Sequence, residues 1–350
     1  MTIYALSSGL GVSGVAIIRV SGNETKNIIN KLTKAHLPNP RLATLRKITK
    51  INTNELIDEG LVLWFPAPQS YTGEDMAEFH VHGSRAVIKA VLDEFSNLEN
   101  CRLAEPGEFT KIALRNEKLN LLEAESIGDL ISSETEIQRR QAIRGMSGNN
   151  FEIYLNWRNK LIKSLANVEA KIDFPDEDLP KNILDEIKNE TEKIKNEIKK
   201  SLDDQKVGER IRDGFKIAIV GPPNAGKSSL LNYMSRREAA IVSETAGTTR
   251  DVIETHLNFN GYPVVISDTA GIRESNDEIE SKGIKLALKK AENADLNIIV
   301  IEPKSGYFTG FLKNLISSNS ILVVNKSDLG IDNILEEFGK FKPIYISIKN

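Results

Sequence analysis

A glycine-containing string after a short apolar run constrains the fold of this chain more than any other feature. Gly221–Ser228 reads GPPNAGKS and fits G-x-x-x-x-G-K-[ST], a pattern in which backbone N–H groups close around phosphate oxygens. The string follows the strand-like run FKIAIV (215–220) and opens a helical pattern at Ser228, as a phosphate-binding loop requires. It predicts an α/β domain with a nucleotide site at the end of a strand.

This loop supplies most of the contacts that we predict for a nucleotide. Lys227 is also predicted to act in catalysis, because its ammonium group reaches the outer phosphates, and the Ser228 hydroxyl is expected to bind Mg²⁺. The start of the following helix presents its positive end to the anion. The predicted contacts in the loop and the first helical turn are Asn224, Ala225, Gly226, Lys227, Ser228 and Ser229.

A second motif, DTAG, begins at the end of the strand-like run YPVVISD (262–268). An aspartate at this point can hold the magnesium shell, and a glycine N–H can contact the terminal phosphate. The nucleotide contacts predicted here are Asp268, Thr269, Ala270 and Gly271.

A third motif, NKSD (325–328), ends the strand-like run ILVVN. The Asp328 carboxylate can accept hydrogen bonds from the N1–H and the 2-amino group of guanine, whereas adenine has no such donor pair. We therefore predict that Asn325, Lys326 and Asp328 select GTP over ATP.

The groups that complete catalysis are less clear from the motifs. GTTRD (247–251) lies where a switch loop contributes a second magnesium ligand, and we assign that role to Thr249. Ile272 stands where Ras-like GTPases carry a water-orienting glutamine, and an aliphatic side chain cannot orient water. Spacing alone does not choose among the nearby acids, which are Glu274, Asp277, Glu278 and Glu280.

The pattern along the chain predicts a multidomain protein of α+β and α/β classes. Residues 1–118 mix strand-like runs (14–22, 61–68 and 77–83) with a helix over 84–99 capped by Ser84. Residues 119–213 carry apolar residues at helical spacing, with Ile187, Thr191, Ile194 and Ile198 on one stripe. Strands alternate with helices in residues 214–350, which predicts a P-loop GTPase domain with a mainly parallel sheet.

Composition excludes several other classes of protein. The 46 basic and 49 acidic residues leave a net charge of −3, so charge alone does not suggest a nucleic-acid coat. Cys101 is the single cysteine, which excludes an internal disulfide and suits a reducing cytoplasm. We see neither an apolar run long enough to cross a membrane nor a secretory signal, and expect a cytoplasmic protein.

Blocks in all parts of the chain share one resemblance. They are GPPNAGKSS, AGTTRD, DTAGIRESNDEIE, IIRVSG (17–22), YTGEDMAEFHVHG (71–83), EPGEFTKIALRNEKLNLLEAESIGDLI (105–131) and KIDFPDEDLP (171–180). These blocks resemble the tRNA-modification GTPase family MnmE (TrmE) over nearly the whole chain. The N-terminal blocks separate the chain from ribosome-assembly GTPases that share the nucleotide motifs.

The resemblance implies an architecture and a second ligand. It implies an N-terminal, homodimerising, folate-binding domain, a helical domain, and a Ras-like G domain inserted into the helical one. The family's contacts to a 5-formyltetrahydrofolate-type folate fall on Arg19, Glu78 and Lys118.

The resemblance also implies activation by potassium. The K⁺ ligands, which also border the nucleotide, would be Asn224, Ser243, Thr245 and Thr248. The cation would supply the positive charge that an arginine finger gives elsewhere, and Glu280 would position the attacking water. The implied pathway forms a carboxymethylaminomethyl group on the wobble uridine of certain tRNAs, together with the FAD-dependent partner MnmG (GidA).

The end of the chain departs from the family pattern. Ser347–Lys349 falls where the family has its last guanine-contacting loop. We expect the final G-domain helix, the returning half of the helical domain and a C-terminal tail with a functional cysteine to be missing. Cys101 does not replace that cysteine. We therefore expect uncovered apolar surface on the helices of 119–213 and impaired tRNA modification.

Two patterns have simpler interpretations, and two rival functions stay open. Gly9–Gly14 matches GxGxxG, but a strand-like run follows it, so we expect a turn between strands. His80 and His82 alternate without a third metal ligand, which favours polar contacts. The rivals are a GTP-dependent ribosome-assembly factor, for which we find no KH-like GXXG loop, and a folate-binding module whose truncated G domain lacks turnover.

Overall fold

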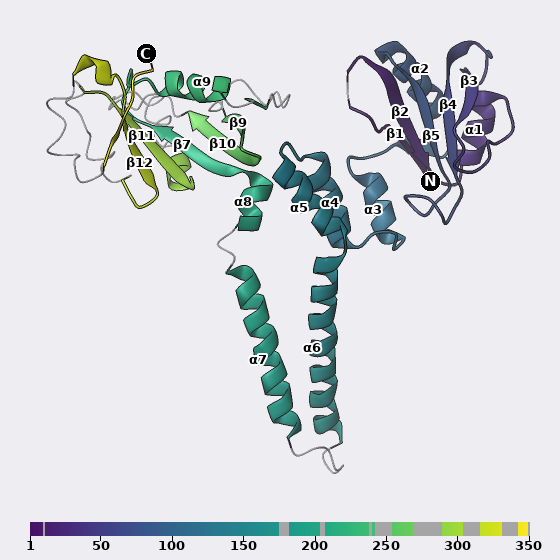
Figure 1. Cartoon of the computed structure of the whole chain (residues 1–350). Helices are drawn as coiled ribbons and strands as arrows, with labels where there is room; N and C mark the ends of the chain where they lie inside the picture. The colour runs from purple at the N-terminus through teal and green to yellow at the C-terminus, as the bar shows by residue number, and fades with distance from the viewer. Residues whose placement is uncertain are drawn as a thin grey trace, which may run out of the picture. The chain divides into compact units, whose positions relative to one another are not determined.

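The structure is a computed structural model that describes residues 1–9, 11–174, 182–203, 207–237, 240–241, 254–268, 289–303, 316–330 and 342–348. The chain divides into two compact units, Met1–Glu125 and Ser126–Asn350. Figure 1 labels most of their helices and strands. In the described part of the chain, no helix combines the length and the apolar character needed to span a bilayer.

The first unit is built on a six-stranded sheet with the order β3-β4-β5-β2-β1-β6. Its strands are β1 (Thr2–Leu6), β2 (Ser13–Ser21), β3 (Thr44–Thr49), β4 (Leu56–Phe65), β5 (Met76–Gly83) and β6 (Cys101–Leu103). Its helices are α1 (Thr25–Thr33), α2 (Arg85–Ser96) and α3 (Glu108–Arg115). All strand pairs are antiparallel except β1 with β6.

The predicted α+β character of this region is confirmed. The three expected strands appear as β2, β4 and β5, and the expected helix appears as α2. The Ser84 hydroxyl accepts a hydrogen bond from the Val87 N–H at 3.1 Å, as predicted for an N-cap. The described residues 7–9 and 11–12 connect antiparallel β1 and β2, so the GxGxxG pattern begins between two strands, as expected, and ends within β2.

Alternation along β2 assigns its side chains to two faces of the sheet. Ile18 and Val20 are fully buried in a core that also contains Phe79 of β5 and Phe95 of α2. Since successive strand residues point to opposite faces, Arg19 lies on the face away from this core. The same rule places the candidate folate residues of β2 and β5 on one side of the sheet.

One ion pair in this unit is expected to make the stability of the fold depend on pH. An Arg102 Nη1 hydrogen bond of 2.8 Å to the Glu108 carboxylate, helped by the Glu105 N–H, lowers the pKa of Glu108 from 4.5 to about 2. The unfolded chain therefore binds more protons at acid pH, so the pair stabilises the fold above about pH 4.5 and this contribution is lost toward pH 2.

We expect Arg102→Met to cause a modest reduction in the free energy of unfolding at pH 7, as for a strong but partly exposed pair. The deficit should shrink toward pH 3. Urea unfolding of the full chain at several pH values measures this. Arg115→Met, which changes an exposed arginine at the end of α3, is the matched control. Parallel pH profiles for wild type and Arg102→Met would contradict the prediction.

The helical region contains α4 (Leu121–Ile131), α5 (Glu136–Met146), α6 (Asn149–Asp173), α7 (Ile183–Leu202) and α8 (Val207–Asp213). The helical pattern after residue 119 is interrupted at Thr135, whose side chain caps α5 in a capping box with Gln138. α6 and α7 lie side by side (Figure 1), joined by a Trp157 Nε1–Glu197 hydrogen bond of 2.6 Å and a Lys160–Glu190 ion pair of 3.1 Å.

The expected stripe on α7 is only partly correct. Ile194 is buried, but Thr191 is exposed and its hydroxyl donates to the Ile187 carbonyl at 2.6 Å. The Thr191 hydroxyl is thus satisfied by its own helix on the exposed surface. Exposed apolar side chains on these helices include Ile131, Leu165, Ile172 and Leu202.

The second unit also contains a seven-stranded sheet with the order β13-β12-β11-β7-β10-β9-β8. The strands are β7 (Phe215–Val220), β8 (Ala240–Ile241), β9 (Glu254–Phe259), β10 (Tyr262–Asp268), β11 (Leu296–Ile301), β12 (Ser320–Val324) and β13 (Ile344–Tyr345). In this order, each strand from β13 to β10 is parallel to the next. The pairs β10–β9 and β9–β8 are antiparallel. The mainly parallel sheet is thus confirmed.

Strand β9 was not anticipated, although its sequence carries a signal. Asn260 and Gly261 connect β9 to β10 with φ values of 52° and 91°, and Asn-Gly is a strong two-residue hairpin signal.

Alternating strand residues fill one core on each face of this sheet. Ala218, Val220 and Ile299 belong to one buried cluster. Ile219 and Ile266 belong to the other, with Leu231 of α9 (Lys227–Arg237) packed among them. The helix after the glycine-rich loop is therefore anchored on the sheet, which places its N-terminus at the loop.

Candidate nucleotide site

The loop 221–226 connects β7 to α9 at the carboxyl end of the parallel strands. A Cβ on Gly221 would lie 2.0 Å from the Val300 carbonyl oxygen of β11, so only glycine fits there. A Cβ on Gly226 would lie 2.1 Å from the Asn325 amide nitrogen, and its φ of 93° also favours glycine. The two glycines of the motif therefore allow the loop to approach its neighbouring strands closely.

Lys227 is a buried cation inside this loop. Its side chain is only 5% exposed, and Nζ donates hydrogen bonds of 3.0 Å to the carbonyl oxygens of Gly221 and Pro222. Carbonyl dipoles solvate an ammonium group without neutralising it. The site consequently holds a buried ammonium group that a phosphate could contact.

The residues around Lys227 differ in their exposure. Ser228 and Ser229, in the first turn of α9, are exposed, and Ala225 is buried. Asn224 is exposed in the left-handed region at φ 63°, which asparagine tolerates better than most residues. The hydroxyls at the helix N-terminus thus lie where the helix dipole favours an anion.

The NKSD motif lies beside the loop, and Asn325 joins the two. The Asn325 Nδ2 group donates a 2.9 Å hydrogen bond to the Ala225 carbonyl, across 100 residues of sequence. Asn325 is 3% exposed, and its buried Oδ1 has no hydrogen-bond partner among the residues that the structure describes. An unpaired buried acceptor at this place is suited to a ligand.

Lys326 and Asp328 of NKSD also have protein partners for their side chains. The Ser347 hydroxyl donates to Asp328 Oδ1 at 2.9 Å. Lys326 Nζ forms an ion pair with the Glu302 carboxylate. The structure therefore brings the loop and NKSD together, as the sequence predicted.

Glu302 was not identified from the sequence as a site residue. The signal was present, because LNIIVIEP places an acid directly after a buried strand, and ligands of parallel sheets bind at the carboxyl ends of strands. Ser347 was assigned only as the start of a loop. Its contact with Asp328 depends on β13 lying beside β12, which no local pattern specifies.

The remaining residues assigned to the site lie at the end of a described segment or outside the described residues. Asp268 is the last residue of β10, in register with Ile219 of β7, so its backbone reaches the same sheet edge as the loop. Outside the described residues lie Ser243, Thr245, Thr248, Thr249, Thr269, Ala270, Gly271 and Glu280.

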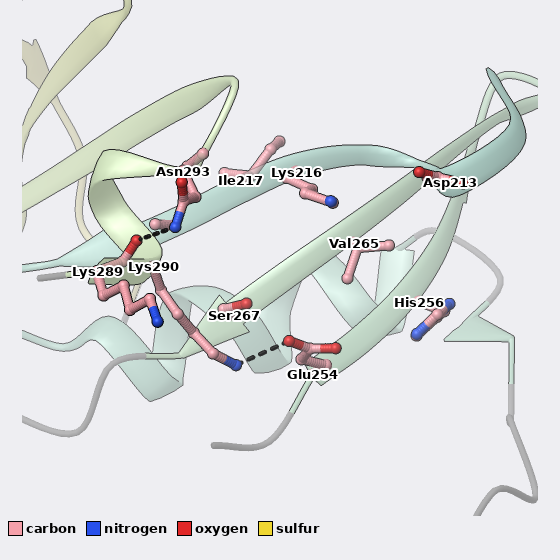
Figure 2. Close-up of a pocket in the computed structure, with 12 residues that line it drawn as sticks. Asp213, Lys216, Ile217, Glu254, His256, Val265, Ser267, Lys289, Lys290 and Asn293 are labelled. Atoms are coloured by element: carbon pink, nitrogen blue, oxygen red, sulfur yellow. Dashed lines mark hydrogen bonds and ion pairs between the residues drawn. The ribbon is translucent and has the colours of Figure 1, made fainter. Parts of the chain in front are cut away.

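A pocket of about 420 Å³ on this domain is a different feature (Figure 2). Charged groups of both signs line it, and Lys290 contacts Glu254 at 2.7 Å, which lowers the pKa of that carboxyl. Its described lining includes no residue of 221–229 or 325–328. The mixed charge and the separate lining give no support for placing the triphosphate here.

In the N-terminal unit, the structure brings two of the three candidate folate residues together. Arg19 Nη2 lies 2.8 Å from Glu78 Oε1, and the guanidinium lies 5.4 Å from the Tyr71 ring centre and 5.6 Å from that of Phe109. Lys118 is exposed, and its Cε would lie 3.1 Å from a Cβ on Gly73. No described contact joins Lys118 to the pair.

The two alternating histidines contact carboxylates. His80 Nε2 lies 3.4 Å from Glu78 Oε2, and His82 Nδ1 lies 2.8 Å from Asp58 Oδ1. These are the polar contacts expected from the sequence. Among the described residues, no group of three or more His, Cys, Asp or Glu side chains could hold a metal ion.

Sequence comparison identifies relatives over nearly the whole chain. The family described as "GTP-binding protein TrmE N-terminus" matches residues 2–118, and "MnmE helical domain" matches residues 121–350. The tRNA modification GTPase MnmE of Pelagibacter ubique is 68% identical over 329 residues, covering 94% of this chain and 74% of the relative. The protein of the same name from Rickettsia bellii is 45% identical, with 100% and 79% covered.

Some solved structures are similar to part of this chain. A variant of Aquifex aeolicus Era bound to GDP and AlF4⁻ is 30% identical over 38% of this chain and 50% of its own, with a TM-score of 0.31. The G domain of the Thermotoga maritima FeoB iron transporter is 24% identical over 38% of this chain and 87% of its own, with a TM-score of 0.30. Neither TM-score is high enough to support an inference about this chain.

Proposed function

Because the chain belongs to the MnmE (TrmE) family of tRNA modification GTPases, we propose that it is a K⁺-stimulated GTPase that helps to form a carboxymethylaminomethyl group on the wobble uridine of tRNA. The FAD-dependent protein MnmG would be its partner in that reaction. The observation that carries the GTPase assignment is the buried Lys227, held by loop carbonyls beside the NKSD motif.

The geometry around Lys227 supports a phosphate site with magnesium. Lys227 would neutralise the β- and γ-phosphates while the loop N–H groups and the N-terminus of α9 hold their oxygens. The exposed hydroxyl of Ser228 and the position of Asp268 at the end of β10 fit a cation held by few protein groups and by phosphate oxygens. Thr249 would complete this set. Bound Mg²⁺ would neutralise charge on the β- and γ-phosphate oxygens.

The base would lie at NKSD. Asp328 would accept the two guanine donors, and its hydrogen bond from Ser347 holds the carboxylate in place beforehand. Since the bond occupies one lone pair on Oδ1, the carboxylate retains acceptors for the base. Binding would thus discriminate guanine from adenine by leaving Asp328 unpaired with the wrong base.

Two catalytic assignments remain part of the proposal. Asn224, on the exposed side of the loop, would bind K⁺ together with Ser243, Thr245 and Thr248. Glu280 would orient the attacking water in place of a glutamine. The family resemblance supports both assignments.

The N-terminal unit would bind a 5-formyltetrahydrofolate-type folate and form a homodimer. Arg19, fixed by Glu78 beside two aromatic rings, offers a cation and flat apolar surfaces that suit an aromatic ring system with carboxylates. Lys118 would be a further contact. We propose domain limits of 1–118, 119–213 and 214–350.

The test is GTP hydrolysis by the full chain in KCl and in equimolar NaCl. We expect stimulation of at least about tenfold by K⁺, since a positive charge at the transferring phosphate is worth far more than this in related enzymes. Asn224→Ala should abolish the stimulation, whereas Asn319→Ala, at an exposed asparagine of the same domain, should not.

The outcomes separate the parts of the proposal. Equal rates of GTP hydrolysis in KCl and in NaCl would overturn the proposed role of potassium but leave the GTPase assignment intact. Failure to bind GTP in a direct titration would overturn both, and folate binding without turnover would favour the rival folate-binding module.

A further inference from the structure

Glu302 and Lys326 emerge together at the carboxyl edge of the G-domain sheet. β11 and β12 are parallel neighbours with Ile301 opposite Val324, and the Asn325 N–H donates to the Ile301 carbonyl at 2.8 Å. Glu302 is the first residue after β11, and Lys326 is the second after β12. The acid therefore comes from a different strand than the motif whose lysine it contacts.

The pair constrains a side chain that is otherwise flexible. Lys326 Nζ forms an ion pair with the Glu302 carboxylate, with the side chains 35% and 24% exposed. The Lys326 backbone has φ 60°, in the left-handed region. A lysine side chain has a flexible stem of four methylene groups and loses considerable rotamer entropy when it is fixed. An ion pair at the ammonium group therefore restricts the rotamers of the whole stem.

The position of Lys326 within the motif relates this direction to the base. Asn325 binds the phosphate loop through Ala225, and Asp328 is held by Ser347. Lys326 lies between these two anchors in the sequence. A lysine with its ammonium held elsewhere can present its methylene groups as apolar surface, which suits the flat face of a purine.

We propose that Glu302 is a positioning residue for guanine-nucleotide binding, which acts by holding the Lys326 ammonium so that the lysine stem packs against the base. The inference rests on the proposed GTP site. Without the carboxylate, the stem would sample several rotamers, and binding would have to order it. The loss should therefore appear in nucleotide affinity, while a partly exposed pair contributes little to folding.

A double-mutant cycle tests the mechanism with GDP as the probe. We expect Glu302→Gln to raise the Kd for GDP about fivefold or more, and Lys326→Met to raise it as well, within the range of coupled neighbours. In the Lys326→Met background, Glu302→Gln should have almost no further effect. Glu302→Asp should restore part of the affinity, and Glu292→Gln, at an exposed acid of the same domain, should leave it unchanged.

The cycle also distinguishes a positioning role of Glu302 from a purely structural role, and it tests the nucleotide site separately. Additive effects of the two substitutions, or a change of less than twofold in Glu302→Gln, would overturn the inference while wild-type GDP binding stays intact. Absence of GDP binding by the wild-type chain would overturn the nucleotide site itself. If Glu302→Gln lowers the unfolding temperature, the cycle is run with Glu302→Asp, where additivity again counts against the proposal.

Discussion

Lys227→Ala is expected to lower the rate of GTP hydrolysis by at least about hundredfold, comparable to removing one preorganised group that stabilises transition-state charge. The lysine is buried and already held by two carbonyl oxygens at 3.0 Å. Its charge is therefore in place before the nucleotide arrives. Single-turnover hydrolysis at saturating GTP measures the chemical step, and a GDP titration measures the accompanying loss of affinity.

A lysine elsewhere in the domain provides the control. Lys216 is exposed near the start of β7 and lines the pocket of Figure 2. We expect Lys216→Ala to hydrolyse GTP at nearly the wild-type rate. If Lys227→Ala stays within about tenfold of wild type, the phosphate site is not where we place it.

Asp328→Asn is expected to weaken GTP binding by about hundredfold or more and to improve binding of XTP. An asparagine offers one carbonyl oxygen and an NH₂ group, so it loses an acceptor for guanine and gains a donor for the 2-carbonyl of xanthine. Sites built on paired polar groups discriminate strongly, because the wrong ligand leaves a buried group unpaired. Competition of XTP and GTP against a labelled GDP measures the change.

The fold should tolerate this substitution. The Ser347 hydroxyl, which donates to Asp328 Oδ1 at 2.9 Å, can donate equally to an amide oxygen. Asp213→Asn, at an exposed aspartate that ends α8, is the matched control and should keep the preference for GTP. An unchanged ratio of GTP to XTP affinity in Asp328→Asn would show that the base lies elsewhere.

Local patterns determined much of this protein. FKIAIV, YPVVISD and LNIIVIEP predict strands because alternation and β-branching act over neighbouring residues. GPPNAGKS predicts its loop because its glycines permit conformations and approaches that other residues do not, as Gly226 at φ 93° illustrates. NKSD likewise predicts a guanine nucleotide from local sequence, because the side chains that select the base lie in four consecutive residues.

Tertiary structure alone decided which of these residues touch. The Asn325–Ala225 hydrogen bond, the Lys326–Glu302 ion pair and the Ser347–Asp328 bond each join separate segments. Each requires the strand order β13-β12-β11-β7 and its register. Strand order depends on how helices and loops return the chain to the sheet, which is a property of the whole domain.

The N-terminal sheet shows the same division. Alternation along β2 placed Arg19 opposite the buried side chains, and any sequence of this pattern would do so. Its pairing with Glu78 depends on β2 lying against β5 in a register that a shift by one residue would destroy. The sequence by itself thus determined strands, caps and the residues that carry chemistry, because these depend on near neighbours. Only the tertiary structure determined the contacts that assemble a site, because they require chain segments far apart in sequence to meet at one sheet edge.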